Sequence, residues 1–430
     1  MNKKIKNNAN SDKNVKSPKH YSLFTMSFRN IWRNKTRSGV ILGAITLGLF
    51  AGTYLSAFMS GWMVGTVNDE INTNLSHIQI RDTAFSANND INAYFLRENI
   101  DATLRKGTAQ HVSYRLNING MLASANNAVG VRANGVNRTE DMAVSTVWQT
   151  IPDTLGEFLP DDARNPIVIS AKTAKKLKVK LRSKIVFSFP NTEGEMQAMS
   201  FRVCGIFHTA NTAFDEGNVF MRYDDIFPAT ALPQDAVHVA AIMFGNDTPL
   251  DKIDELSLEI KAVFLDLDVK SWKEINPLIA MSMGMIDMFA IGIIAIFLLA
   301  LAFGIINTML MAVLERTHEL GMLRAIGMSR GQVFRMIMLE TIFLTLVGSI
   351  TGVILATLVL LPSIHSGVDL TPLMGNSFED YGGFSSVVYP VVNFKMFAQI
   401  LLLVIAAGIL SAIYPARKAL KIKILEAMRG

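Results

Sequence analysis

Long apolar runs alternate with polar segments along this chain. Residues 38–68, 288–314, 341–361 and 396–415 contain no Asp, Glu, Lys or Arg. About 20 apolar residues in an α-helix are enough to cross the hydrocarbon core of a bilayer. The pattern therefore predicts four transmembrane helices.

The segment between the first two runs has a different pattern, in which apolar and polar residues alternate in short stretches. An alternation of period two is typical of half-buried strands, and a period near 3.6 is typical of amphipathic helices. The predicted strands cover residues 76–81, 111–123, 127–136, 166–170, 184–189, 199–208, 218–222 and 236–244, and the predicted helices cover 91–105, 171–178 and 250–264. This mixture predicts an α+β domain, or two packed lobes.

The basic residues are distributed unevenly around the apolar runs. Ten Lys and Arg lie within the first 37 residues, three lie at Arg316, Arg324 and Arg330, and five follow Pro415, whereas residues 362–393 contain none. Short loops rich in Lys and Arg stay on the cytosolic side of a membrane. Both termini and the segment 315–331 are therefore predicted to be cytosolic, and residues 63–285 to be extracytosolic.

The predicted fold class is a membrane α-helical protein with four transmembrane helices and a large extracytosolic α+β domain inserted between spans 1 and 2. The first residues are rich in Asn and Lys, which favours disorder, and the next segment separates aromatic from basic residues on a helix, as interfacial helices do. A plain juxtamembrane helix is the alternative there. The predicted parts are a disordered cytosolic tail (1–20), an interfacial amphipathic helix (21–37), span 1 (38–62), the extracytosolic domain (63–285), span 2 (286–314), a cytosolic helix (315–331), span 3 (336–361), a short extracytosolic loop (362–394), span 4 (395–416) and a cytosolic tail (417–430).

Two features of the spans concern their packing. GxxxG spacings let helix backbones approach closely in a membrane, and they occur at Gly39/Gly43, Gly48/Gly52 and Gly348/Gly352. Glu340 lies one turn into span 3, where a charge needs a partner. Arg335 or an interfacial water is the predicted partner, and a structural role is favoured over a proton path.

The polar segment between spans 2 and 3 is short and contains no Pro. Leu320, Leu323 and Ile326 recur at helical spacing among charged residues. The segment is therefore predicted to be an amphipathic helix at a membrane face, with a side free to meet a soluble partner.

The run ERTHELGMLRAIGMSRGQVFRMIMLE resembles the signature of the FtsX-like (MacB-like) permeases of ABC transporters, the mechanotransmission class that includes macrolide exporters and the lipoprotein-releasing LolC and LolE subunits. The closing SAIYPARKALKIKILEAMRG, with Ile424 where that family usually has Pro, and the opening FRNIWRNKTRSGVILGAITLG are similar to the same family. In the extracytosolic part, PIVISAKTAKKLKVKL and FRVCGIFHTANTAFDEGNVFM resemble passages of its members, most closely LolC and LolE.

The resemblance implies a location in the bacterial inner membrane and a coupling helix that docks on a separate ABC ATPase dimer. The implied partners also include a second permease copy or a paralogous permease, and membrane lipid. Carried over to this chain, the coupling residues are Glu315, Arg316, His318, Glu319, Leu320, Gly321, Leu323, Arg324, Ile326 and Gly327.

Motifs for enzymatic chemistry are absent from the sequence. It has no G-x-x-x-x-G-K-[ST] phosphate loop, so it is not expected to be the ATPase, and ATP-Mg is expected on the partner. Seven scattered His predict no metal site, and the single Cys204, in a strand-like context, predicts a buried thiol rather than a reactive one. No cofactor is expected on this chain, and no nucleic acid partner.

Seven basic residues and no acid lie between residues 172 and 184. A solvated helix face explains them simply, and a surface for anionic lipid or an acidic partner is the alternative. They are Lys172, Lys175, Lys176, Lys178, Lys180, Arg182 and Lys184.

The favoured function is the permease subunit of an ABC complex that releases lipoproteins from the inner membrane to a periplasmic carrier. The alternatives are a permease of the same class for drug or peptide efflux or for signalling to a cell-wall hydrolase, and a membrane sensor or scaffold without transport. Large, deformable side chains near the outer ends of spans 1 and 2 suit acyl chains, although the same stripe also suits helix packing. The candidate cavity residues are Phe50, Tyr54, Phe58, Met59, Met285, Met288 and Phe289.

Overall fold

The chain divides into two units, one built from long helices and the other around a β-sheet. The computed structural model describes residues 33, 35–106, 111–245, 248–374, 387–392 and 394–420. The first unit takes the described residues up to Ala57, Phe289–His365 and those from Val392 onward, and the second takes Phe58–Met288 and the described part of Ser366–Val391. The predicted tail 1–20 and most of the predicted amphipathic helix 21–37 lie outside the described residues.

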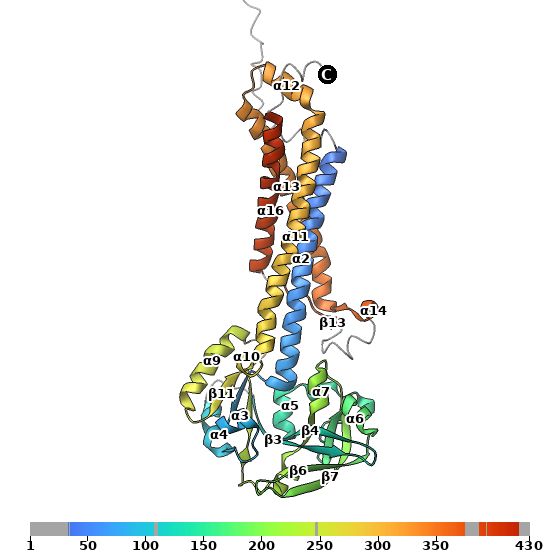
Figure 1. Cartoon of the computed structure of the whole chain (residues 1–430), viewed down its shortest axis with the longest axis vertical. Helices are drawn as coiled ribbons and strands as arrows, with labels where there is room; N and C mark the ends of the chain where they lie inside the picture. Colours follow the sequence, from blue (N-terminus) through green and yellow to red (C-terminus); the bar gives the residue numbers. More distant parts are fainter. Residues whose placement is uncertain are drawn as a thin grey trace, which may run out of the picture. The chain divides into compact units, whose positions relative to one another are not determined.

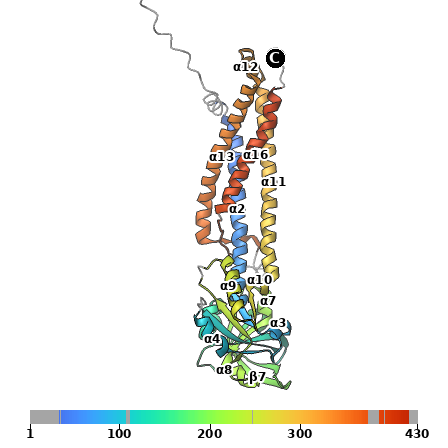
Figure 2. The same ribbon diagram turned by 90° about the vertical axis from the view of Figure 1, so that its left-hand side faces the viewer.

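The apolar segments form four long helices, which run side by side in the first unit (Figure 1 and Figure 2). They are α2 (Lys35–Glu70), α11 (Pro277–Glu315), α13 (Arg330–Ser366) and α16 (Phe394–Leu420). Within the described chain, four helices are long and apolar enough to cross a membrane. Each helix extends beyond its predicted span because the flanking polar residues also favour helix; a π-helical turn, η1 (Ile71–Leu75), continues α2.

Close packing of α13 on α2 depends on two glycines. A Cβ atom at Gly348 would lie 2.8 Å from Cγ2 of Ile45, and one at Gly352 would lie 3.0 Å from Cβ of Leu49. The predicted role of the Gly348/Gly352 spacing is therefore confirmed. At Gly39 and Gly43 a Cβ atom would meet no neighbouring element among the described residues within 4 Å, so their predicted role stays a prediction.

The second unit is built around a nine-stranded sheet with the order β11-β1-β10-β3-β4-β8-β5-β7-β6, and β6 also pairs with β3. Six strands from β3 to β6 thus close into a ring, and Gly120 permits the closure because a Cβ there would lie 2.6 Å from Ser188 O. The strands are β1 (Ile78–Arg81), β3 (His111–Ala123), β4 (Ala128–Val136), β5 (Pro166–Ser170), β6 (Lys184–Pro190), β7 (Met196–Phe207), β8 (Asn218–Arg222), β10 (Val239–Met243) and β11 (Asp268–Ser271); β2 (Phe95–Leu96) pairs separately with β9 (Ala236–Val237).

Shorter helices cover the sheet and connect its strands. They are α3 (Thr83–Asn88), α4 (Arg97–Lys106), α5 (Arg138–Val144), α6 (Ala171–Leu177), α7 (Thr212–Gly217), α8 (Tyr223–Ile226), α9 (Leu250–Val263), α10 (Trp272–Ile275) and the 3-10 turns η2 (Val147–Thr150), η3 (Asp153–Leu155) and η4 (Phe227–Ala229). The predicted helix 91–105 is wrong over its first residues, because Phe95 pairs with Val237 as a strand before α4 begins at Arg97. The predicted loop 362–394 contains the end of α13, β12 (Val368–Asp369), α14 (Thr371–Met374) and β13 (Val387–Val388).

Two large buried clusters make up most of the core of this unit, and two smaller ones add to it. One lies inside the strand ring, where alternate residues of β3 such as Leu116, Ile118 and Leu122 point inward. The other joins β1, β10 and β11 to α9 and η1, with Trp272 fully buried in it. The two large clusters agree with the predicted alternative of two packed lobes. One continuous sheet runs through both lobes.

His77 is a buried, neutral side chain in the second cluster. Its Nδ1 accepts a hydrogen bond of 3.0 Å from the Phe244 N–H, and burial lowers its pKa from 6.5 to about 4. Between these two pKa values the unfolded chain binds a proton that the folded chain does not. The stabilisation from the neutral imidazole is thus complete above pH 6.5 and is lost as the pH falls toward 4.

We expect acidification from about pH 7 to about pH 4 to remove on the order of 3 kcal/mol of stability through this histidine. Urea unfolding of the full chain in detergent, followed by tryptophan fluorescence, measures the loss. His77→Asn keeps a side-chain acceptor but does not titrate, so its stability should change less over the same range. An equal loss in wild type and His77→Asn would contradict the assignment.

Candidate functional site

The corner between α11 and α13 contains a separate short helix, α12 (Thr317–Ala325), at one end of the helical unit (Figure 1). The predicted helix 315–331 is therefore too long. Glu315 ends α11, Arg316 leaves the helical region with φ −103° and ψ 19°, and Arg330 begins α13.

The turn from α12 into α13 is built by two capping motifs. At the end of α12, the Gly327 N–H donates to Arg324 O (3.2 Å) and the Met328 N–H donates to Leu323 O (3.1 Å), with Gly327 at φ +111°. This pattern is a Schellman motif, in which glycine adopts the positive φ without strain. A short, hydrogen-bonded turn therefore fixes where α12 ends.

The start of α13 is fixed by Ser329 and Gln332. The Ser329 N–H donates to Gln332 Oε1 (2.7 Å), and the Gln332 N–H donates to Ser329 Oγ (3.3 Å). This reciprocal arrangement is a capping box, which satisfies two N–H groups at a helix start. The capping box begins at Ser329, directly after the Schellman motif ends at Met328, so hydrogen-bonded residues continue from α12 into α13.

Gly327→Ala should destabilise the corner by about 1 kcal/mol, because alanine is strained at this positive φ while the surrounding space is open. Thermal unfolding of the full chain in detergent measures the effect. Gly331→Ala is the matched control, since Gly331 lies within α13 with open space around it and no positive φ. Equal stability of Gly327→Ala and wild type would contradict the motif.

Two ion pairs hold α12 and its flanks. Arg33 pairs with Glu319, and this hydrogen bond lowers the pKa of the Glu319 carboxyl. Nη1 of Arg316 lies 3.4 Å from Oε1 of Glu340, and the two side chains are only 15% and 12% exposed. The predicted pairing of Glu340 with Arg335 is wrong, because residues five apart on a helix point about 140° away from each other.

The predicted coupling residues fall into three groups by exposure. Leu320 and Gly321 are buried, Arg316, Glu319, Leu323 and Arg324 are half-buried, and Glu315, His318, Ile326 and Gly327 are exposed. Of the three apolar residues at helical spacing, Leu320 and Leu323 pack on the core of the helical unit, and only Ile326 remains exposed. The exposed apolar side chains are instead Ile326 (81%) and Met322 (48%), one turn apart. Sequence reasoning missed Met322, although its i, i+4 spacing to Ile326 was visible.

A pocket of about 320 Å³ lies between α11, α12, α13 and Arg33. Apolar side chains such as Met309 and Met336 line it together with the four residues of the two ion pairs. The corner thus combines a charged pocket, which Met322 also lines, with two exposed apolar side chains, Met322 and Ile326.

The candidate substrate residues differ in their burial and packing. Phe50 and Tyr54 pack on each other, with ring centroids 5.8 Å apart, and against Ala356 and Leu360. Phe58 and Met59 are half-buried, and each of Met285, Met288 and Phe289 is more than half exposed. The packing of Phe50 and Tyr54 favours the helix-packing interpretation for those two residues.

The basic run 172–184 occupies α6 and the turn that leads into β6. Lys176 pairs with Glu216 at 3.0 Å and Lys172 donates to Thr212 Oγ1 at 2.8 Å. Lys175, Lys178, Lys180, Arg182 and Lys184 are exposed, so a solvated face and a docking surface both remain compatible with the geometry.

Cys204 is half-buried, and its Sγ donates to Ile167 O at 3.3 Å. Burial raises its pKa to about 11, so the thiol is protonated at neutral pH. Among the described residues, no group of three or more His, Cys, Asp and Glu is placed to hold a metal ion.

Four apolar helices, with an α/β unit inserted between the first two, define a multi-spanning membrane protein. Residues 291–424 match the FtsX-like permease C-terminal family model, so the chain carries an FtsX-like permease domain that includes α12 and the corner. This match confirms the resemblance found in the corner sequence.

Several named proteins are similar to parts of the chain. An uncharacterised ABC transporter permease of Methanocaldococcus jannaschii is 25% identical over 296 residues, 64% of this chain and 65% of that protein. The ABC transporter permease YtrF of Bacillus subtilis is 33% identical over 34% of this chain and 32% of its own length. The lipoprotein-releasing system transmembrane protein LolC of Xylella fastidiosa is 24% identical over 55% of this chain and 57% of that protein. The chain thus spans less than two thirds of each of these relatives.

Among solved structures, the periplasmic region of MacB from Actinobacillus actinomycetemcomitans is similar to 49% of this chain, and the match covers 95% of that region. The sequence identity is 14% and the TM-score is 0.34.

Proposed function

We propose that this chain is the permease subunit of an ABC transporter, in which a separate ATPase drives conformational change across the membrane. The observation that supports the proposal is the corner: α12 lies between two apolar helices and exposes Met322 and Ile326 as an apolar pair. The FtsX-like domain in residues 291–424 and the permease relatives agree with it.

The corner is suited to transmit movement. A force on α12 acts on α13 directly, because the Schellman motif and the capping box leave no unstructured residue between them. The pairs Arg33–Glu319 and Arg316–Glu340 connect α12 and its flank to the start of α2 and to α13. A rigid lever of this kind moves helices together instead of bending at the corner.

In this proposal the ATPase dimer binds the corner from the cytosol and holds ATP-Mg, and a second permease copy or a paralogous permease completes the complex. The basic residues around the corner and at both termini support a cytosolic position for them in a bacterial inner membrane. The α/β unit then lies outside the cytosol.

The test places a photocrosslinking amino acid at Met322 and at Ile326 in living cells. The expected adduct contains an ABC ATPase, identified by mass spectrometry, and its location also establishes the side of the membrane. Leu402 on α16, which is 68% exposed in a predicted span, is the control and should crosslink to no ATPase. Adducts from Met322 and Ile326 that contain no ATPase would contradict the proposal.

For the substrate, we propose acylated proteins, released from the membrane to a periplasmic carrier. The similarity to LolC supports this choice, and transfer of an acyl chain out of lipid costs about 0.8 kcal/mol per methylene, which requires an energy source such as ATP. Photocrosslinkers at Phe58 and Phe289 should give adducts with lipoproteins. Adducts with neighbouring helices only, together with normal lipoprotein sorting after depletion of the protein, would favour efflux, as the name of the macrolide exporter MacB suggests for that relative.

A further inference from the structure

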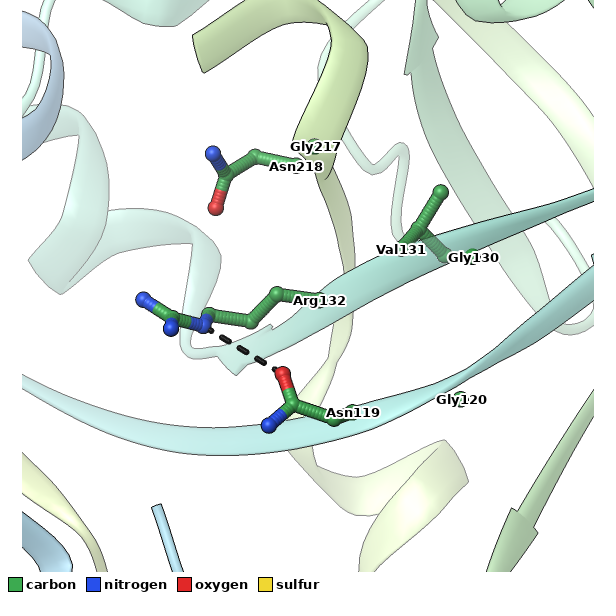
Figure 3. A pocket seen from close by; sticks show the side chains of 7 residues that line it. All are labelled: Asn119, Gly120, Gly130, Val131, Arg132, Gly217 and Asn218. Atoms are coloured by element: carbon green, nitrogen blue, oxygen red, sulfur yellow. Dashed lines mark hydrogen bonds between the residues drawn. The ribbon is translucent and has the colours of Figure 1, made fainter. Parts of the chain in front are cut away.

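A second pocket, of about 440 Å³, lies on the ring of strands in the α/β unit. Asn119 on β3, Arg132 on β4 and Asn218 at the start of β8 are direct register partners across three neighbouring strands. Figure 3 shows Asn119 and Asn218 on either side of the Arg132 side chain. The register therefore places one guanidinium and two amides in the same hollow.

The hydrogen bonds in this pocket leave donors in excess. Nε of Arg132 donates to Asn119 Oδ1 at 3.5 Å and Nη2 donates to Asn89 Oδ1 at 3.4 Å, both at the long limit. Asn218 Oδ1 already accepts from Asn134, and Nδ2 of Asn218 donates to Phe214 O. The amide oxygens that face Arg132 thus already accept hydrogen bonds, while the guanidinium has N–H groups for which the described part of the chain offers no acceptor.

The positive charge in the pocket is not neutralised nearby. Among the described residues, no carboxylate lies within 4.0 Å of Arg132. Burial, and then the charge of the nearby Arg132, lower the pKa of Arg81 to about 10. The local field therefore favours an anion and opposes a metal ion.

Glycines leave room in the pocket, because they place no side chain in it. Apart from their chain neighbours, no atom of the described residues lies within 4 Å of a Cβ placed at Gly130 or at Gly217, and both residues line the pocket. Its volume falls in the range typical of sites for small organic ligands, about 300–1,000 Å³. The vacant space is thus larger than a single anionic group needs.

We propose that this pocket binds a carboxylate carried by a peptide, with Arg132 as its main contact and Asn119 as a supporting donor. A carboxylate offers only acceptors and matches the planar fork of a guanidinium. The surplus donors, the positive charge and the room for neighbouring peptide atoms all agree with an acidic residue in an extended segment. The proposal does not depend on the transport function.

The experiment measures binding of a capped pentapeptide, Gly-Gly-Glu-Gly-Gly amide with a neutral fluorescent dye, to the full chain in detergent by anisotropy. We expect saturable binding that weakens at least about 10-fold for the peptide with Gln in place of Glu, since hydrogen bonds to a charged group are the stronger ones. Arg132→Gln should cause a similar loss, and Arg132→Lys a smaller one. Arg202→Gln, an exposed position on β7 outside the pocket, is the matched control and should bind as wild type.

A second variant keeps the test decisive if Arg132→Gln does not fold. Gly130→Val suits a strand, has open space around it and places methyl groups in the pocket, so it should abolish binding at unchanged thermal stability. Absence of saturable binding to wild type, equal binding of the Glu and Gln peptides, or wild-type binding by both pocket variants would overturn the proposal. Competition by inorganic phosphate but not by acetate would assign the pocket to phosphate groups instead.

Discussion

Ile326→Glu is expected to reduce ATPase-coupled activity at least about 30-fold while leaving the chain folded. Ile326 is 81% exposed, so a carboxylate there remains in water when the chain is alone. In a docked complex the same carboxylate would be buried against the partner, at a cost of 2 kcal/mol or more, which corresponds to about 30-fold in affinity. Substrate-dependent ATP hydrolysis by the reconstituted complex measures the effect.

Two controls separate docking from folding. Ile326→Val keeps an apolar surface and should retain most activity. Leu320→Ala lies inside the corner, where the side chain is 6% exposed, and should instead lower the stability of the chain by roughly 2–5 kcal/mol. Normal coupling in Ile326→Glu would show that α12 does not dock through this surface.

Arg316→Met should destabilise the corner by about 3 kcal/mol, because it removes a cation that lies 3.4 Å from the largely buried Glu340 carboxylate. Removing one member of a buried pair costs about 3–5 kcal/mol, and the lower end applies here because the charge of Arg33 also acts on Glu340. The double variant Arg316→Met/Glu340→Met removes both charges and should recover most of the loss. Thermal unfolding of the four proteins gives the coupling energy of the pair.

The pair can contribute both to stability and to the transmission of movement between the helices. If the double variant recovers stability but still has reduced ATP-driven transport, the two contributions are separate, because the double variant lacks the ionic connection. Additive losses in the two single variants would mean that Arg316 and Glu340 act independently and that the 3.4 Å contact has no energetic weight.

The local pattern of apolar and polar residues was sufficient to predict most helices and strands. The apolar runs predicted four helices because a spanning segment must be apolar along its whole length. Strands were predicted at the observed bounds from two kinds of pattern: partial alternation in 111–123, and a short apolar run between polar residues in 218–222. Phe95 is an exception: it lies within a predicted helix, but it pairs with Val237, far along the chain, as a strand.

Some features of the corner depend on tertiary contacts and could not be predicted from neighbouring residues alone. The glycine at 327 and the Ser329 and Gln332 pair are local signals of a helix end and a helix start, and the predicted helix 315–331 did not take them into account. Which side of α12 faces inward depends on α11 and α13, so Leu320 and Leu323 became core and Met322 became surface. The partner of Glu340 is likewise set by the turn of α12, which brings Arg316 back to α13.

The sequence by itself determined the spans, most strands and the family resemblance of the corner, because each depends on residues that are neighbours along the chain. The closure of the strand ring from β3 to β6, the close contact of Gly348 with Ile45 and the meeting of Asn119, Arg132 and Asn218 were decided only by the tertiary structure. Asn119 and Asn218 are separated by many strands and turns, and no local propensity encodes the register that brings them to the same pocket.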